Sequence, residues 1–164
     1  MSPMLMIASL AITAALALYT AGVFRERVRR RIDVGTLALF WLGLACDTTG
    51  TTLMTMMARS GGAGAPAIHG ITGAAAIILM LFHAGWAAVV WLRGRKRDAA
   101  ALERERVFHR FSTAVWLLWL IPYLIGLLVG VPMIHLRTVC AVGTSVIVVA
   151  ALAWAMFRPQ RQTA

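Results

Sequence analysis

Residues 69–92 read HGITGAAAIILMLFHAGWAAVVWL, a stretch of 24 residues without a single Asp, Glu, Lys or Arg. A helix needs about 20 apolar residues to cross the hydrocarbon core of a bilayer. Because lipid offers the backbone no hydrogen-bond partners, such a stretch is expected to be helical. The sequence therefore predicts an all-α, polytopic membrane protein, a bundle of five transmembrane helices in one domain over residues 1–164. The other four spans are Met4–Phe24, Val34–Met57, Phe111–Gly130 and Ile134–Phe157.

The composition supports a membrane protein. The chain has 60% hydrophobic and 13% charged residues, against about 45–50% and about 25% in soluble domains. A soluble fold of this length has too little interior to bury that much apolar surface. A soluble enzyme, a nucleic-acid-binding domain and a disordered tail are excluded, and the lipid bilayer is the expected partner. Cys46 and Cys140 lie in apolar segments at a spacing that fits no zinc or disulfide framework.

The positive charges predict the orientation. Of the 16 Lys and Arg residues, 14 lie after the first span, between the third and fourth spans, or after the fifth. The other two connections carry Arg59 and Arg137 alone. Loops rich in Lys and Arg face the cytoplasm, so the N-terminus is expected outside and the C-terminus inside, in the cytoplasmic (inner) membrane. The first span lacks a basic stretch before it and is expected to be retained rather than cleaved. Residues 98–108 are expected to extend the fourth span as a cytoplasmic helix.

Four histidines are candidate ligands. His69 and His83 are 14 positions apart in the third span, which puts both on nearly the same helix face about 21 Å apart. The residues on the helix face between the two histidines are mostly small. They would leave the groove that a flat macrocycle needs to approach the backbone. His135 opens the fifth span level with His69, and His109 precedes the fourth span on the cytoplasmic side. His83 with His109, and His69 with His135, would hold the iron of one or two non-covalent b-type haems.

This spacing resembles the haem-ligand pattern of the cytochrome b subunit of respiratory bc complexes and of small di-haem membrane cytochromes. The resemblance implies electron transfer, with quinone or a redox partner, by a membrane oxidoreductase or electron carrier. It departs from that pattern because the partner histidines, His109 and His135, come from two helices rather than one. Interfacial placement of His69, His109 and His135 is the competing structural interpretation.

Asp47 is the second functional candidate, as a catalytic acid or proton carrier. A carboxylate in the middle of a span costs about 2.5–3.5 kcal/mol on insertion scales. Asp47 and His83 lie about one turn apart in depth on neighbouring spans, so a hydrogen bond between them is expected, either directly or through one water. Asp47 could then orient His83 as a metal-binding imidazole. The pair would serve a proton- or cation-coupled transporter, with the Thr48, Thr49, Thr51 and Thr52 hydroxyls as oxygen ligands for a cation. A protonated Asp47 in a helix contact, in a non-catalytic accessory subunit, is the structural alternative.

Small and aromatic residues suggest packing roles. The face containing Gly43 and Gly50 permits close helix approach and allows a homo-oligomer. Trp116, Trp119 and Tyr123 form a row along the fourth span that is expected to belong to the core.

Several short motifs resemble those of the HsmA-like family of small bacterial membrane proteins, over residues 40–130. They are CDTTGT at 46–51, HGITG at 69–73, HAGW at 83–86, HRFS at 109–112 and WLIPYLIG at 119–126. The resemblance implies a small bacterial membrane protein and assigns no reaction. Motifs for ATP binding, serine or zinc hydrolysis and covalent haem attachment are absent from the sequence.

Overall fold

The computed structural model describes residues 3–60, 67–94, 99–130 and 137–157. These residues form five helices and no strand: α1 (Pro3–Arg29), α2 (Val34–Arg59), α3 (Ala67–Arg93), α4 (Ala99–Gly130) and α5 (Thr138–Phe157). Each of the five is long and apolar enough to cross a membrane. The all-helical fold and its five candidate spans are therefore confirmed.

Two helices are longer than the apolar stretches that predicted them. α1 runs five residues beyond Phe24 into the arginine-rich segment, and α4 begins at Ala99 instead of Phe111. The early start of α4 confirms the predicted extension of the fourth span. α5 begins at Thr138 rather than at the predicted Ile134, and residues 131–136 lie outside the described residues.

α1 and α2 pack along a seam, in which buried residues recur at intervals of three, four or seven positions along the two helices. The buried positions of α2 in this seam are Thr36, Phe40, Gly43, Asp47 and Gly50, and those of α1 include Ala8, Ala15, Tyr19, Gly22 and Glu26. Spacings that alternate between three and four residues keep one helix face on its partner, as in a coiled coil. The result places Tyr19 and Asp47, two polar side chains, inside the bundle.

Glycines let large side chains of the opposite helix enter this seam. A Cβ atom at Gly22 would lie 2.7 Å from the ring of Phe40, and one at Gly50 would lie 2.4 Å from Cγ1 of Ile12. Gly43 also faces Tyr19, but with more room, since an added Cβ atom would lie 3.4 Å from it. The predicted close-packing face of α2 is therefore confirmed, but its partner is α1 of the same chain. That face provides no surface for a second copy, and the predicted homo-oligomer loses this support.

The connection between α1 and α2 is fixed by Asp33, the N-cap of α2. Its Oδ1 accepts a hydrogen bond of 2.8 Å from the backbone N–H of Thr36, as N-cap carboxylates do. Its Oδ2 accepts from Arg25 at 2.8 Å and from Arg29 at 3.0 Å. The side-chain hydrogen bond from Arg25 is the main reason that the pKa of Asp33 lies well below its ordinary value. Arg30, with φ of 51°, ends α1 in the left-handed conformation typical of helix ends.

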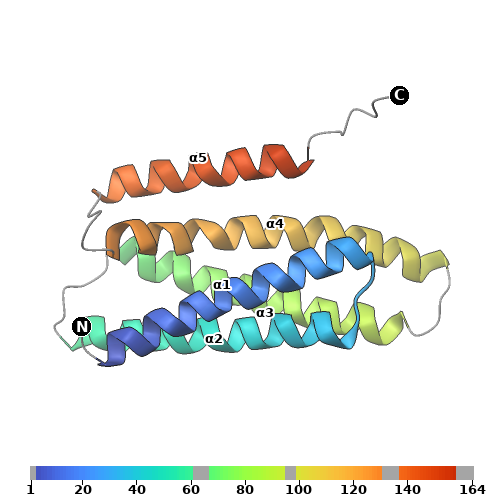
Figure 1. The fold of residues 1–164 in the computed structure, drawn as a ribbon, viewed down its shortest axis with the longest axis horizontal. Coiled ribbons are helices and arrows are strands. Elements are labelled where there is room, and N and C mark those ends of the chain that lie inside the picture. The colour runs from blue at the N-terminus through green and yellow to red at the C-terminus, as the bar shows by residue number, and fades with distance from the viewer. Residues whose placement is uncertain (1–2, 61–66, 95–98, 131–136, 158–164) are drawn as a thin grey trace.

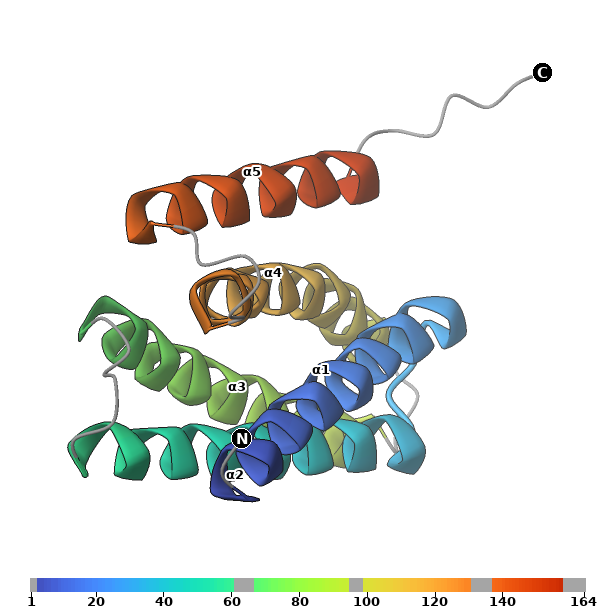
Figure 2. The same ribbon diagram turned by 60° about the vertical axis from the view of Figure 1, so that its left-hand side comes forward.

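The helices α1 to α4 form the body of the molecule, and α5 lies along α4 on its outer side (Figures 1 and 2). α5 packs against α4, and Arg27 of α1 donates a hydrogen bond of 3.0 Å to the backbone carbonyl of Met156 on α5. We call the end of the bundle where α1 ends and α2 begins the arginine-rich end, after Arg25, Arg27, Arg29, Arg30 and Arg31. α3 ends and α4 begins at this same end (Figure 1).

Candidate functional site

Tyr19 and His83 are joined by a hydrogen bond in the centre of the bundle. The phenol oxygen of Tyr19, on α1, meets Nδ1 of His83, on α3, and both side chains are 0% exposed. Either group can be the donor, because a phenol both donates and accepts and each imidazole nitrogen can carry the proton. The bond can therefore form with either group as the donor.

Aromatic rings enclose His83. The ring of Phe108 stacks on it with a centroid distance of 4.9 Å and an interplanar angle of 14°. The ring of Phe40 meets it edge-on at 4.6 Å, and Phe111 lies at 6.1 Å. The imidazole is thus held in one orientation by side chains from α1, α2 and α4.

Asp47 lies in the same region, with a different partner from the one that the sequence suggested. Its carboxylate is buried, and Oδ2 accepts a hydrogen bond of 3.3 Å from Nε1 of Trp119 on α4. The Trp119 ring in turn lies 5.9 Å from that of Tyr19. Asp47 and His83 therefore belong to one cluster, but the structure connects them through Trp119 and Tyr19 rather than by a direct hydrogen bond.

A second buried pair lies toward the arginine-rich end. Oε1 of Glu26, on α1, is 2.6 Å from Nδ1 of His109, on α4. The Glu26 side chain is 1% exposed and that of His109 is 22% exposed. The contact joins α1 to α4 and leaves His109 as the member of the pair that reaches the surface.

Two buried polar atoms of the described residues have no hydrogen-bond partner, namely Nε2 of His83 and Oγ of Ser112. Ser112 is one helical turn beyond Phe108, the residue whose ring stacks on His83. Unpaired buried polar atoms are rare, because each one costs roughly 1–3 kcal/mol. Each of the two atoms marks a place where water or a ligand atom would be stabilised.

The predicted haem ligands are only partly described. His135 lies outside the described residues, and for His69 the structure describes the backbone within α3 but not the side chain. His109 pairs with Glu26 through Nδ1, and its role with His83 as axial ligands of one haem stays a prediction. The outer pair, His69 with His135, stays a prediction.

The surroundings of His83 leave haem binding there a prediction. Its free Nε2, with Nδ1 held by a hydrogen bond, has the arrangement of a metal-binding imidazole. A haem bound through Nε2 would lie beyond that atom, whereas Phe40 and Phe108 pack against the ring itself at 4.6 and 4.9 Å. We derive no chemistry from a haem at this position.

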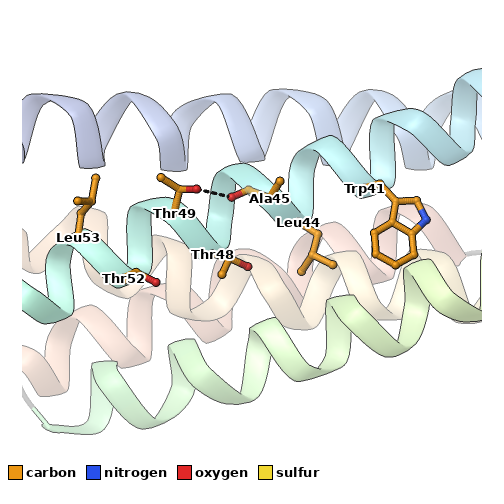
Figure 3. Close-up of a pocket in the computed structure, with 7 residues that line it drawn as sticks. All are labelled: Trp41, Leu44, Ala45, Thr48, Thr49, Thr52 and Leu53. Atoms are coloured by element: carbon orange, nitrogen blue, oxygen red, sulfur yellow. Dashed lines mark hydrogen bonds between the residues drawn. The ribbon is translucent and has the colours of Figure 1, made fainter.

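The threonines of α2 form a separate feature. Thr48, Thr49 and Thr52 line an open groove of about 570 Å³ together with Trp41, Leu44, Ala45 and Leu53. Figure 3 shows Leu44, Thr48, Thr52 and Trp41 projecting from one side of α2. These three hydroxyls are exposed, whereas Asp47 is buried in the seam with α1. The described structure therefore does not gather them with Asp47 around a cation. Nor do the described His, Cys, Asp and Glu side chains form a group of three that could hold a metal ion.

Sequence reasoning missed Tyr19 and Glu26. Tyrosine is common in apolar spans, and Glu26 stands within a run of arginines where a solvated side chain is expected. The available signal was their spacing, since Tyr19 and Glu26 are seven residues apart on the face that also carries Ala8 and Ala15. The core role predicted for Trp116 and Trp119 is confirmed by exposures of 6% and 2%.

Comparisons with protein families, with curated proteins and with solved structures found no match to this chain. The functional argument therefore depends on the residues and contacts described above.

Proposed function

We propose that this protein moves protons across the cytoplasmic membrane through the interior of α1 to α4, with Asp47, Tyr19 and His83 as the central carriers. The observation that carries the proposal is the buried hydrogen bond between Tyr19 and His83. It joins two groups that can each donate or accept a proton, inside a helix bundle whose core is mainly apolar.

The cost of these side chains supports a functional interpretation. Ionisable groups inside a membrane are expensive and are a functional hypothesis by default. Here α1, α2, α3 and α4 each contribute at least one, as Glu26, Asp47, His83 and His109. Packing alone would be satisfied more cheaply by apolar side chains of similar volume.

The proposed chemistry is the stepwise transfer of one proton at a time. Asp47 holds a proton as a neutral carboxylic acid or releases it as a carboxylate. Tyr19 exchanges a proton with Nδ1 of His83 along their hydrogen bond, and Nε2 of His83 is free to exchange a proton with a neighbouring water. The aromatic side chains Phe40, Phe108 and Trp119 keep bulk water away from these groups and hold their orientation.

The orientation belongs to the same proposal. The distribution of Lys and Arg, with 14 of 16 at one side of the predicted topology, supports a cytoplasmic arginine-rich end. Protons would then pass along α1 and α4 between the membrane depth of Asp47 and the cytoplasm.

The test is proton flux into proteoliposomes that contain a pH-sensitive dye and are energised by a potassium diffusion potential. Wild-type protein is expected to conduct, and Asp47→Asn is expected to reduce the flux to that of empty liposomes. Glu103→Gln is the matched control, because Glu103 is an exposed carboxylate on α4 that pairs with Arg106. Equal flux through wild type and Asp47→Asn, or no flux through wild type, would overturn the proposal.

A reduced-minus-oxidised absorption spectrum of the purified protein separates this proposal from the cytochrome hypothesis. A colourless preparation that conducts protons supports proton movement. Stoichiometric haem that disappears in His83→Ala would replace the proposal with electron transfer.

A further inference from the structure

Glu26 and His109 form a buried carboxylate–imidazole pair with one member at the surface. The oxygen and nitrogen that face each other are 2.6 Å apart, and the side chains are 1% and 22% exposed. A carboxylate as buried as that of Glu26 needs a partner, because an unpaired charge in an apolar interior is strongly unfavourable. His109 satisfies this need and also connects the carboxylate to the outside of the bundle.

The pair is aligned with the central cluster along α1. Glu26 follows Tyr19 by seven residues, which is about 10.5 Å along the helix and about 20° short of two full turns. Both side chains therefore leave α1 on the same face, toward the interior of the bundle. On this buried face of α1, the Glu26 carboxylate is the next ionisable group after the Tyr19 hydroxyl in the direction of the arginine-rich end.

The pair is also aligned with the cluster along α4. Phe108, the residue before His109, stacks on the ring of His83. Ser112, one turn further on, carries a buried hydroxyl without a hydrogen-bond partner. Nε2 of His83 is also buried and without a partner. A water molecule at each of these atoms would satisfy it, and buried waters occupy such positions.

We propose that Glu26 and His109 are the site at which the central carriers exchange protons with the cytoplasmic solution. This inference rests on the proposed function and assigns to that function two residues beyond Asp47, Tyr19 and His83. A proton from the solution binds the His109 imidazole, and the imidazolium passes its Nδ1 proton to Oε1 of Glu26. The neutral carboxylic acid then gives this proton to the water near Ser112 and His83, which restores the carboxylate. Exchange with solvent restores the His109 tautomer.

The experiment measures proton flux in the same proteoliposomes with two substitutions of His109. In His109→Gln the amide N–H can still donate a hydrogen bond to Glu26, so the fold is retained while proton transfer is lost. In His109→Ala the ring is removed and leaves space for a small base. We expect both variants to lose at least about tenfold in flux, because a positioned acid–base group contributes at least that much. Imidazole added on the arginine-rich side should restore flux in His109→Ala and not in the double variant Glu26→Gln/His109→Ala.

The outcomes separate this inference from the proposed function. Wild-type flux with undiminished flux in His109→Gln would overturn the inference and leave the proposed function standing. Loss of flux in His109→Ala without rescue by imidazole would also overturn it, because the pair would then act through the fold alone. Wild-type protein that conducts no protons would overturn both.

Discussion

The phenol oxygen of Tyr19 and Nδ1 of His83, 64 positions apart in the sequence, share a buried hydrogen bond between α1 and α3. The bond satisfies one polar atom of each side chain, and both side chains are buried in the bundle. A buried polar atom that loses its partner costs more than the bond contributes when both partners are present. The stability of the bundle and the ionisable cluster are therefore coupled at this point.

Tyr19→Phe removes the hydroxyl and leaves Nδ1 of His83 without its partner. We expect the free energy of unfolding to fall by about 1–3 kcal/mol, which is the usual range for one unsatisfied buried group. Unfolding of the detergent-solubilised protein by heat or by SDS measures the change. Tyr123→Phe is the matched control, because Tyr123 is only partly buried and its ring contact with Trp119 does not need the hydroxyl. A loss no greater than that of the control would show that the bond contributes little.

The indole N–H of Trp119 satisfies the buried carboxylate of Asp47. We expect Trp119→Phe to lower the free energy of unfolding by more than the loss of ring size alone would, because it leaves the carboxylate oxygen of Asp47 unpaired. Asp47→Leu combined with Trp119→Phe removes both polar partners and should cost less than the sum of the single changes, by about 0.5–3 kcal/mol. A double-mutant cycle in unfolding experiments measures this coupling. Strict additivity of the two changes would argue against the hydrogen bond.

The sequence predicted the helices well because length and hydropathy are local properties. A run such as residues 69–92 has one structural solution in lipid, whatever the other helices do. The same reasoning identified Asp47 and His83, since both interrupt apolar spans. The close-packing face with Gly43 and Gly50 was also visible, as glycines spaced along one helix face.

The partners of these residues were beyond sequence reasoning because they depend on helix rotation and choice of neighbour. Asp47 and His83 were expected to bond each other from their similar depths on α2 and α3. In the structure α1 packs against α2, and the Tyr19 hydroxyl of α1 takes the place next to His83 that Asp47 was expected to occupy. Asp47 instead accepts a hydrogen bond from Trp119 of α4. Glu26 was hidden by its arginine neighbours, because a run of charges usually marks a solvated segment.

The ion pair of Asp33 with Arg25 predicts a specific dependence of stability on pH. The pKa of Asp33 is lowered in the folded protein, mainly by the hydrogen bond from Arg25, so the carboxylate stabilises the fold above its ordinary pKa. This contribution is lost as the pH falls through the ordinary range toward the lowered value. Asp33→Asn keeps an N-cap oxygen for Thr36 but loses the charge, and should cost at most about 1 kcal/mol at pH 7.

Thermal unfolding of wild type and Asp33→Asn at pH 7, 5 and 3 measures this effect. The difference between the two proteins should hold from pH 7 to pH 5 and narrow below about pH 4, where an unfolded Asp begins to bind its proton. Glu103→Gln, which removes an exposed carboxylate on α4, is expected to leave stability nearly unchanged across the same range. A difference that widens as the pH falls would contradict the assignment.

Gly50 sets how closely α1 and α2 approach. A Cβ atom there would lie 2.4 Å from Cγ1 of Ile12 and 3.0 Å from the carbonyl oxygen of Ala8, and neither neighbour is a flexible chain end. Gly50→Ala must therefore push the helices apart, and we expect it to cost about 1–3 kcal/mol, as overpacking of a core does. Gly85→Ala is the control, since nothing lies within 4 Å of the added atom, and a helical Ala is more stable than Gly by up to about 1 kcal/mol. If the two alanine variants unfold at the same SDS concentration, the close approach of α1 and α2 at Gly50 is wrong, and with it the geometry that places Asp47 and Tyr19 in one seam.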